Sequence, residues 1–247
     1  MSSIRVYRDP LPTIDVPQMA EISRLMAEEY HISPLQSMEN TGRCLAILAR
    51  DRFLESNPSG KRVMVLAGTG SNGGGALACA RRLNGWGAEV EVYTASARER
   101  MNPESIHQLS ILERMGISIR SGKELGATLG FDLIIDGIIG YNLSGDPEGL
   151  PRKMIEWANK SPIPTLSLDT PSGLDLATGK AHTPTIKARA TLTLGLPKSG
   201  LYAEEVLHLR GELYLADIGV PPSLFEEPGL EIKAAPIFCE SDVLRIE

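Results

Sequence analysis

The chain has 247 residues and a formal net charge of −6, and 42% of its residues are hydrophobic. This acidic balance argues against non-specific nucleic-acid binding, which needs a basic surface. The sequence contains no run of about 18 apolar residues that predicts a membrane span, and its first residues lead into no secretory signal. Three widely spaced cysteines form no zinc motif and favour a reducing compartment. We therefore expect a cytoplasmic protein with neither nucleic-acid nor membrane partners.

The predicted elements begin with two helices and continue as alternating strands and helices. Apolar residues at helical spacing predict a helix over 15–30 and a second from near Gln36 to near Leu54. Apolar or alternating segments then predict strands over 62–67, 89–93, 118–120, 133–135, 165–168, 190–194 and 212–215. Helices are predicted between these strands over 74–85, 98–115 and 151–159, with Pro151 at the first position of the last one.

Alternation of strands and helices indicates an α/β fold with a mostly parallel sheet whose two faces are both covered. The sequence contains no internal repeat and no linker long enough to divide the chain. We therefore predict that residues 1–247 form a single domain. The two N-terminal helices are expected to pack on the sheet or to carry a surface for self-association.

A glycine-rich segment follows the first strand of the alternating region. Residues 68–76 read Gly-Thr-Gly-Ser-Asn-Gly-Gly-Gly-Ala. Backbone N–H groups at a helix start bind anions, so the segment predicts a site for a phosphorylated small molecule. The segment also matches the dinucleotide fingerprint G-x-G-x-x-G, but the second strand ends at 92–96 without the acid that holds a ribose. A conventional NAD dehydrogenase is thus disfavoured, and a glycine turn needed only for packing remains an alternative.

Two carboxylates, Asp136 and Asp169, each end a short apolar strand. The carboxyl ends of parallel strands meet near the change in strand order, so both should approach residues 68–76. For either acid alone, a helix-capping or turn role is the alternative. Asn72, Asp136 and Ser172 could supply hard oxygen ligands to a cation. One carboxylate among neutral oxygens suits a monovalent ion better than a divalent one.

The remaining polar residues carry weaker predictions. The histidines lie outside the polar strand ends, and we interpret them as structural or solvated: His31, His107, His182 and His208. The sequence has no Gly-x-Ser-x-Gly motif, so it does not support a serine hydrolase. Lys198 could reach a phosphate or be a solvated loop residue.

Five motif-bearing segments occur in order over nearly the whole chain. Residues 38–43 are similar to M-E-N-A-G-R, 68–76 to G-P-G-N-N-G-G-D-G, 136–140 to D-A-[IL]-[FL]-G and 168–175 to V-D-[IV]-P-S-G-x-[DN], and 191–201 is similar to a closing segment. Together they resemble the YjeF N-terminal domain family, whose best-known activity is NAD(P)HX epimerase. This resemblance implies a Rossmann-like, three-layer α/β/α sandwich with a mostly parallel sheet, which is often a homodimer.

The same resemblance implies a reaction and a set of residue roles. The reaction is epimerisation of the C6 hydrates of NADH and NADPH, which repairs damaged nicotinamide nucleotides. A potassium ion is the implied cofactor, with Asn72, Asp136 and Ser172 as its ligands. Asp169 is the candidate catalytic residue, because a carboxylate can pass a proton to and from the hydroxyl. The hydrated NADH or NADPH would contact Ser71, Asn72, Gly73, Gly74, Gly75, Gly140, Tyr141, Asn142, Leu143, Ser144, Gly145, Asp146 and Asp169.

The glycine segment departs from the family pattern. Ser71, Gly75 and Ala76 stand where the family carries Asn, Asp and Gly. This difference favours an alternative hypothesis, a non-catalytic member that binds a nucleotide or a protein partner. Conversion of one hydrate epimer into the other distinguishes the two hypotheses.

Overall fold

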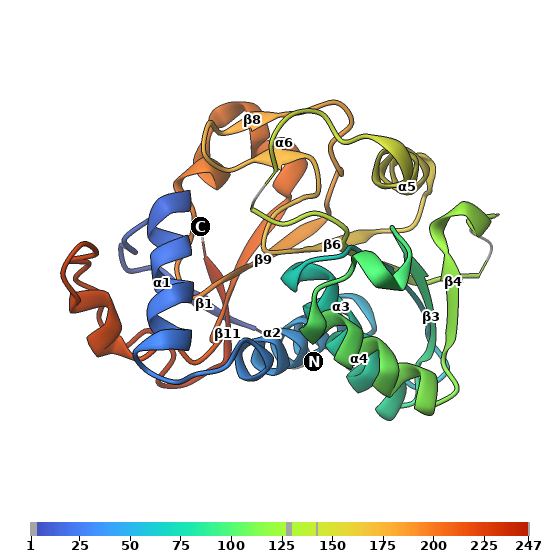
Figure 1. Cartoon of the computed structure of the whole chain (residues 1–247), viewed down its shortest axis with the longest axis horizontal. Coiled ribbons are helices and arrows are strands. Elements are labelled where there is room, and N and C mark those ends of the chain that lie inside the picture. Colours follow the sequence, from blue (N-terminus) through green and yellow to red (C-terminus); the bar gives the residue numbers. More distant parts are fainter. Residues whose placement is uncertain (1–3, 127–129, 142, 247) are drawn as a thin grey trace.

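A computed structural model describes residues 4–126, 130–141 and 143–246, and its centre is a nine-stranded sheet (Figure 1). The strands lie in the order β1-β11-β10-β9-β6-β5-β2-β3-β4. Every pair of neighbours is parallel except β10 and β11. The strands are β1 (Arg5–Tyr7), β2 (Arg62–Ala67), β3 (Glu89–Thr94), β4 (Ser118–Ser121), β5 (Leu133–Gly137), β6 (Thr165–Leu168), β9 (Ala190–Leu194), β10 (Glu212–Ala216) and β11 (Val243–Ile246). A separate antiparallel pair consists of β7 (Leu174–Asp175) and β8 (Lys180–Ala181).

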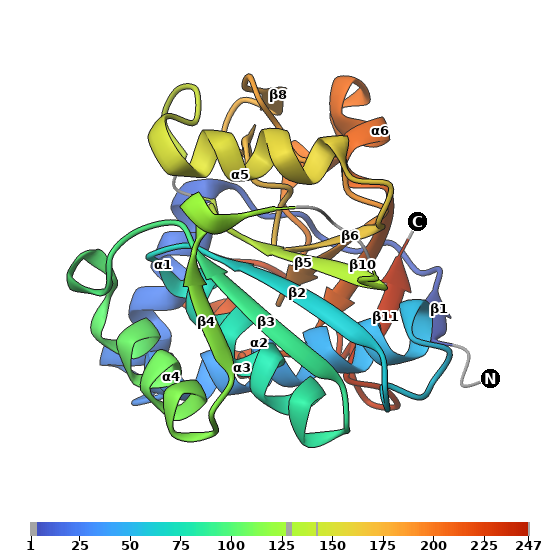
Figure 2. The ribbon, with the colours of Figure 1, turned by 90° about the vertical axis from the view of Figure 1, so that its right-hand side faces the viewer.

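Helices cover both faces of the sheet, which confirms the predicted three-layer α/β class. Figure 2 shows α5 and α6 on one side and α2, α3 and α4 on the other. The α-helices are α1 (Val16–Glu28), α2 (Pro34–Leu48), α3 (Ser71–Gly85), α4 (Pro103–Arg114), α5 (Gly149–Lys160) and α6 (Leu207–Arg210). A π-helical turn, Ala49–Phe53, extends α2, and short 3-10 helices include Arg98–Arg100 and Pro222–Glu226. No helix in the described residues is long and apolar enough to cross a membrane.

The apolar runs form strands because their side chains are buried on both faces of the sheet. Along β2, Val63 and Val65 join the core beneath α2, α3 and α4, whereas Met64 and Leu66 join the core beneath α5. Successive strand residues point to opposite faces, so a strand that is covered on both sides needs an unbroken apolar run. This pattern accounts for the accurate prediction of the central strands.

The N-terminal helices pack within the same body. Asp15 and Ser33 each cap a helix through a reciprocal capping box, and a proline lies in the first turn of each helix. The buried face of α1 contacts the 3-10 helix Pro222–Glu226 in an apolar cluster that includes Ile22 and Phe225. Helix α2 packs against α3 and the strands β9, β10 and β11. Of the two expected arrangements, packing on the sheet therefore holds for α2.

Several elements differ from the prediction. Helix α3 begins at Ser71 rather than at Gly74, because three glycines are accommodated inside the helix. Helix α5 begins at Gly149, so Pro151 occupies its third position. Strand β1 at the sheet edge, its neighbour β11 and the separate pair β7 and β8 are additions to the predicted set, and their short sequences carry no strong period.

Candidate active site

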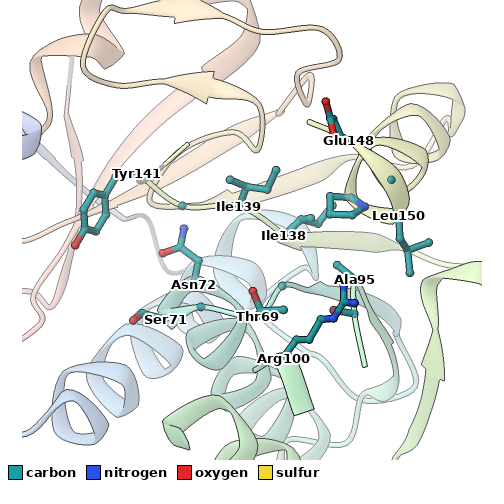
Figure 3. Close-up of a pocket in the computed structure, with 17 residues that line it drawn as sticks. Thr69, Ser71, Asn72, Ala95, Arg100, Ile138, Ile139, Tyr141, Glu148 and Leu150 are labelled. Carbon is teal, nitrogen blue, oxygen red and sulfur yellow. The ribbon is translucent and has the colours of Figure 1, made fainter. Parts of the chain in front are cut away.

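The glycine turn lies where the strand order reverses. Strand β2 leads into α3 on one face, whereas the neighbouring β5 is followed by α5 on the other face. The crevice beyond the carboxyl ends of these strands is the usual ligand site of an open α/β sheet. A cavity of about 670 Å³ occupies this place and is lined by residues of the segments 68–73, 95–100, 138–141 and 148–151 (Figure 3). We call it the switch-point cavity.

Close backbone approach explains two of the glycines at this cavity. A Cβ atom on Gly68 would overlap the carbonyl oxygen of Ile138, and one on Gly73 would overlap that of Gly68. The N-cap of α3 is Gly70, which supplies no side-chain cap. First-turn N–H groups have no acceptor within a helix, so the start of α3 can serve an anion, as the sequence predicts.

Gly74 and Gly75 have a different role from the predicted substrate contacts. Both lie inside α3 and neither lines the switch-point cavity. A Cβ atom on Gly75 would come within 2.9 Å of Leu168 Cδ2 and Thr41 Cγ2. The residue at position 75 therefore determines how closely α3 packs against α2 and β6.

Asp136, at the end of β5, is fully buried and accepts several hydrogen bonds. Ser172 Oγ donates to its Oδ1 at 2.5 Å, and Ser167 Oγ donates to its Oδ2 at 2.8 Å. The backbone N–H groups of Ser172 and Ile138 donate to the same carboxylate at 2.9 and 3.2 Å. Burial raises the pKa of Asp136 above its ordinary range, and the hydrogen bonds oppose that shift.

Asn72 lies beside this carboxylate network. Its Nδ2 donates to Leu168 O at 2.9 Å, and its side chain packs so closely on Gly140 that a Cβ there would come within 2.9 Å of Asn72 Cγ. Ile139 N, one residue before Gly140, donates to Ser172 Oγ at 2.8 Å. The structure thus brings Asn72, Asp136 and Ser172 to one place, and their amide, carboxylate and hydroxyl oxygens fit a hard cation.

Two further observations bear on a cation at this place. Thr170 Oγ1 is buried without a hydrogen-bond partner among the described residues. Thr170 N and Asn72 Nδ2 donate to the same Leu168 carbonyl, so this hydroxyl belongs to the same neighbourhood. The described residues contain no cluster of three or more His, Cys, Asp or Glu side chains. A mixed oxygen set with one carboxylate suits a monovalent ion better than a divalent one, and the ion itself stays a prediction.

Asp169 is held in an unusual backbone conformation at the end of β6. Its φ is +64°, and Thr170 N donates to Leu168 O at 2.8 Å across it, which makes a tight three-residue turn. Left-handed φ values are uncommon outside glycine, and such strain concentrates at functional sites. The side chain is 1% exposed.

Lys198 is the partner of Asp169, which corrects its interpretation as a phosphate-binding or solvated residue. Its Nζ lies 2.6 Å from Asp169 Oδ1, 2.9 Å from Leu194 O and 3.3 Å from Thr193 Oγ1. These three acceptors match the three protons of an ammonium group. Backbone hydrogen bonds between Ile14 and the residues on either side of Lys198 hold its segment in place. All the hydrogen bonds that described residues donate to Asp169 go to Oδ1.

A second, smaller cavity of about 200 Å³ adjoins the first and includes Asp169. Its walls are mainly apolar side chains of α1, α2 and the turn between them, among them Met19 and Met38. Leu194, at the end of β9, and Ile218, after β10, complete the apolar lining. Ser71, Asn72 and Tyr141 line both cavities, so they form the boundary between them. We call this the Asp169 cavity. It offers an apolar space for a flat ring beside one carboxylate.

The predicted contacts in 140–146 divide into two groups. Gly140 and Tyr141 line the switch-point cavity, and Asn142 lies outside the described residues. Leu143, Ser144, Gly145 and Asp146 line neither cavity. Asp146 Oδ1 instead accepts Thr183 N at 3.0 Å and lies 3.2 Å from His182 Nδ1. The hydrogen bond from Thr183 N is the main cause that lowers the pKa of Asp146.

Several residues that line the switch-point cavity were not predicted from the sequence. Arg100 and Ser96 follow β3, and Glu148 precedes α5. The dinucleotide fingerprint concerns an acid after the second strand, whereas the charged residue that lines the cavity there is Arg100. The apolar residues of α1 and α2 that line the Asp169 cavity are indistinguishable by period from residues of an ordinary helix core.

Comparison with known proteins identifies the family. The fold and the site define an α/β protein with a dinucleotide-type switch-point crevice, and residues 35–200 match the model for the YjeF-related protein N-terminus. The chain belongs to this family. The crystal structure of the yeast protein ynu0 superimposes with a TM-score of 0.78 at 25% identity, over 95% of this chain and 100% of the yeast chain.

Curated relatives carry names that describe an activity. A protein of Dehalogenimonas lykanthroporepellens named NAD(P)H-hydrate epimerase is 40% identical over 222 residues, which cover 88% of this chain and 86% of that protein. The bifunctional NAD(P)H-hydrate repair enzyme Nnr of Moorella thermoacetica is 35% identical over 214 residues. Those residues cover 84% of this chain but 40% of the bifunctional enzyme.

Proposed function

We propose that this chain is an NAD(P)H-hydrate epimerase, which interconverts the two C6 hydrate epimers of NADH and NADPH. The observation that carries this proposal is Asp169, a buried and strained carboxylate that borders a cavity beside the glycine turn. A relative with the corresponding name is 40% identical over most of both chains. The activity therefore has both a suitable site and a close family precedent.

The chemistry requires one group that can give and take a proton. In the hydrate, a hydroxyl is bonded to a ring carbon next to the nitrogen. Asp169 is a carboxylate in its pair with Lys198, so the step begins with uptake of a proton from solvent. The protonated acid donates that proton to the hydroxyl while the nitrogen lone pair forms a C=N bond and the C–O bond breaks, which releases water. Water then adds to the opposite face and returns a proton to the carboxylate. One residue thus serves both directions as general acid and general base.

Lys198 is a positioning residue in this scheme. Its ammonium group binds Oδ1 of Asp169 and accounts for its own three donors. Because the described residues donate only to Oδ1, we assign the proton transfer to Oδ2. The Asp169 cavity is small and mainly apolar, so it would exclude bulk water from the bound ring.

We also propose that potassium binds at Asn72, Asp136 and Ser172. When bound, the ion would supply a positive charge that offsets the buried Asp136 carboxylate and orients the oxygens around it. The hydrogen bond from Ser172 to Asp136 and the packing of Asn72 against Gly140 support this assignment. Ser71, Asn72 and Gly73 are the proposed contacts of the nucleotide at the helix start, with Gly140 and Tyr141 opposite them.

The altered glycine segment does not favour the non-catalytic alternative once its packing is considered. Gly75, where the family carries Asp, contacts α2 and β6 and lines neither cavity. Ser71 does line both cavities, but its backbone remains available at the start of α3. We therefore propose catalytic turnover as well as nucleotide binding.

The deciding experiment supplies one purified hydrate epimer and follows the other by chromatography. Spontaneous epimerisation, measured without protein, is subtracted. The proposal predicts rapid approach to the equilibrium mixture. Nucleotide binding without conversion would instead select the non-catalytic alternative.

Location and oligomeric state remain predictions. We propose a cytoplasmic location, supported by cysteines that are all free in the structure: Cys44, Cys79 and Cys239. The predicted homodimer is measurable by sedimentation velocity at micromolar concentration.

A further inference from the structure

A third cavity continues the switch-point cavity beyond β3. It has a volume of about 620 Å³ and shares Ala95, Ser96, Arg100 and Leu150 with the switch-point cavity. The three cavities therefore adjoin in series: the Asp169 cavity, the switch-point cavity at the glycine turn, and this third cavity. We call the third one the β3 cavity.

The β3 cavity is strongly basic in a chain whose net charge is −6. Its charged lining consists of four cations, Arg98, Arg100, Arg120 and Lys123, and one acid, Glu113. Arg98 Nη1 pairs with Glu113 Oε1 at 2.7 Å, which neutralises that acid. Arg120 lies 3.7 Å from Glu91, a looser contact. The concentration of positive charge at one cavity indicates an anionic ligand.

Arg100 is the cation best placed to bind that anion. Its side chain forms no hydrogen bond or ion pair with any residue that the structure describes, although its backbone N–H donates to Ala97 O. Figure 3 shows its side chain extending along the switch-point cavity beside Ala95, whereas Glu148 lies across the cavity on the α5 side. The guanidinium group therefore stands at the passage between the two cavities with all of its donors available.

The position of Arg100 in the fold identifies the anion. In dinucleotide-binding sheets, the residues after the second strand face the adenosine ribose: an acid there binds the 2′-hydroxyl, whereas an arginine accommodates a 2′-phosphate. Here β3 is the second strand of the alternating region and lies next to β2, and the 3-10 helix Arg98–Arg100 follows it. Glu99, in the same 3-10 helix, is exposed and lines none of the three cavities, so Arg100 is the charged residue after β3 that lines the switch-point cavity.

We propose that Arg100 binds the ribose 2′-phosphate of NADPH hydrate, so that this chain prefers NADPH hydrate to NADH hydrate. The inference rests on the proposed function, because it assigns the adenosine end of the same substrate. The ring then occupies the Asp169 cavity, the pyrophosphate faces the start of α3, and the phosphate monoester enters the β3 cavity.

Binding of two nucleotide fragments tests the subsite without turnover. The probes are 2′,5′-ADP and 5′-AMP, which differ only in the 2′-phosphate, titrated calorimetrically at pH 7.5, where that group carries nearly two charges. The wild-type chain should bind 2′,5′-ADP at least about tenfold more tightly, as expected for charge-assisted hydrogen bonds. Arg100→Gln should reduce the ratio to about twofold, and Arg100→Lys should restore part of it.

A matched control separates local binding from general charge. Arg114, exposed on α4, lines none of the three cavities, so Arg114→Gln makes the same charge change and should keep the wild-type ratio. Equal binding of both fragments by the wild type, or an unchanged ratio in Arg100→Gln, would overturn the proposal.

Turnover distinguishes this inference from the proposed function. If both hydrates are epimerised with equal kcat/KM and the fragments bind equally, the subsite is wrong and the activity stands. If neither hydrate is epimerised but the Arg100-dependent preference for 2′,5′-ADP persists, the activity is wrong and the subsite stands.

Discussion

Replacing Lys198 by Met removes the ammonium group that holds Asp169 but keeps a side chain of similar length. Both side chains are 1% exposed, and Nζ lies 2.6 Å from Oδ1. Removing one partner of a buried ion pair costs about 3–5 kcal/mol, because the other charge stays buried without compensation. In a chain of this size, 1 kcal/mol shifts Tm by about 2–4 °C, so we expect Lys198→Met to lower Tm by roughly 6–20 °C.

Thermal unfolding followed by circular dichroism measures this loss. The double variant Asp169→Asn with Lys198→Met should recover most of the stability, since it leaves no unpaired charge. Lys187→Met, at an exposed lysine, is the control and should change Tm little. A Lys198→Met variant within about 2 °C of wild type, or a double variant no more stable than the single one, would refute the reasoning.

The remaining predictions concern packing, the proposed ion and acid stability. Gly75→Asp should destabilise the fold by about 3 kcal/mol or more, because the new Cβ would lie 2.9 Å from Leu168 Cδ2 and the new carboxylate would be buried. Urea unfolding measures this loss, and an unchanged unfolding midpoint would contradict the packing role. Potassium should raise Tm near pH 7 relative to tetramethylammonium, and the gain should vanish in Asp136→Asn. Burial raises the pKa of Asp136, so protonation should weaken the potassium effect as pH falls through that raised value; a pH-independent gain would place the ion elsewhere. Hydrogen bonding to Arg52 lowers the pKa of Glu212 to about 2. The stability lost in Arg52→Gln should therefore be evident at pH 6 and disappear as pH falls from about 4.5 to 2. An equal loss of stability at pH 6 and pH 2 would exclude this linkage.

The sequence was sufficient to predict the central sheet and the convergence of its polar ends. Strands buried on both faces need unbroken apolar runs, so β2, β5 and β6 were recognisable from composition alone. Parallel strands present their carboxyl ends at one edge, which is why Asn72, Asp136 and Ser172 could be expected to meet. These predictions depend on periodicity and on general topology.

Other features depend on contacts between segments that are distant in the sequence. Lys198 follows β9 and looks like a loop lysine in the sequence. Its burial depends on backbone pairing with Ile14, which lies near the N-terminus and far from Lys198 in the sequence. The role of Gly75 depends on how closely α3 approaches α2. A family comparison at one position could identify the missing Asp, but it could not show that the position faces a packing interface.

The arrangement of the three cavities gives the chain a physical basis for nucleotide selection. The reacting ring and the ribose phosphate occupy opposite ends of the proposed site. Changes at Arg100 should therefore alter the preference between hydrates, whereas changes at Asp169 should affect the chemical step for both. The two ends can be examined with separate variants.

The most direct test of the central claim compares epimerisation by wild type and Asp169→Asn, with spontaneous conversion subtracted. General acid–base catalysis contributes about 10²–10⁴-fold, so kcat should fall at least about 100-fold while NADPH affinity changes by only a few-fold. Asp175→Asn, which alters a turn outside the three cavities, should retain the wild-type rate. An Asp169→Asn variant that folds normally and keeps the wild-type epimerisation rate would contradict the account.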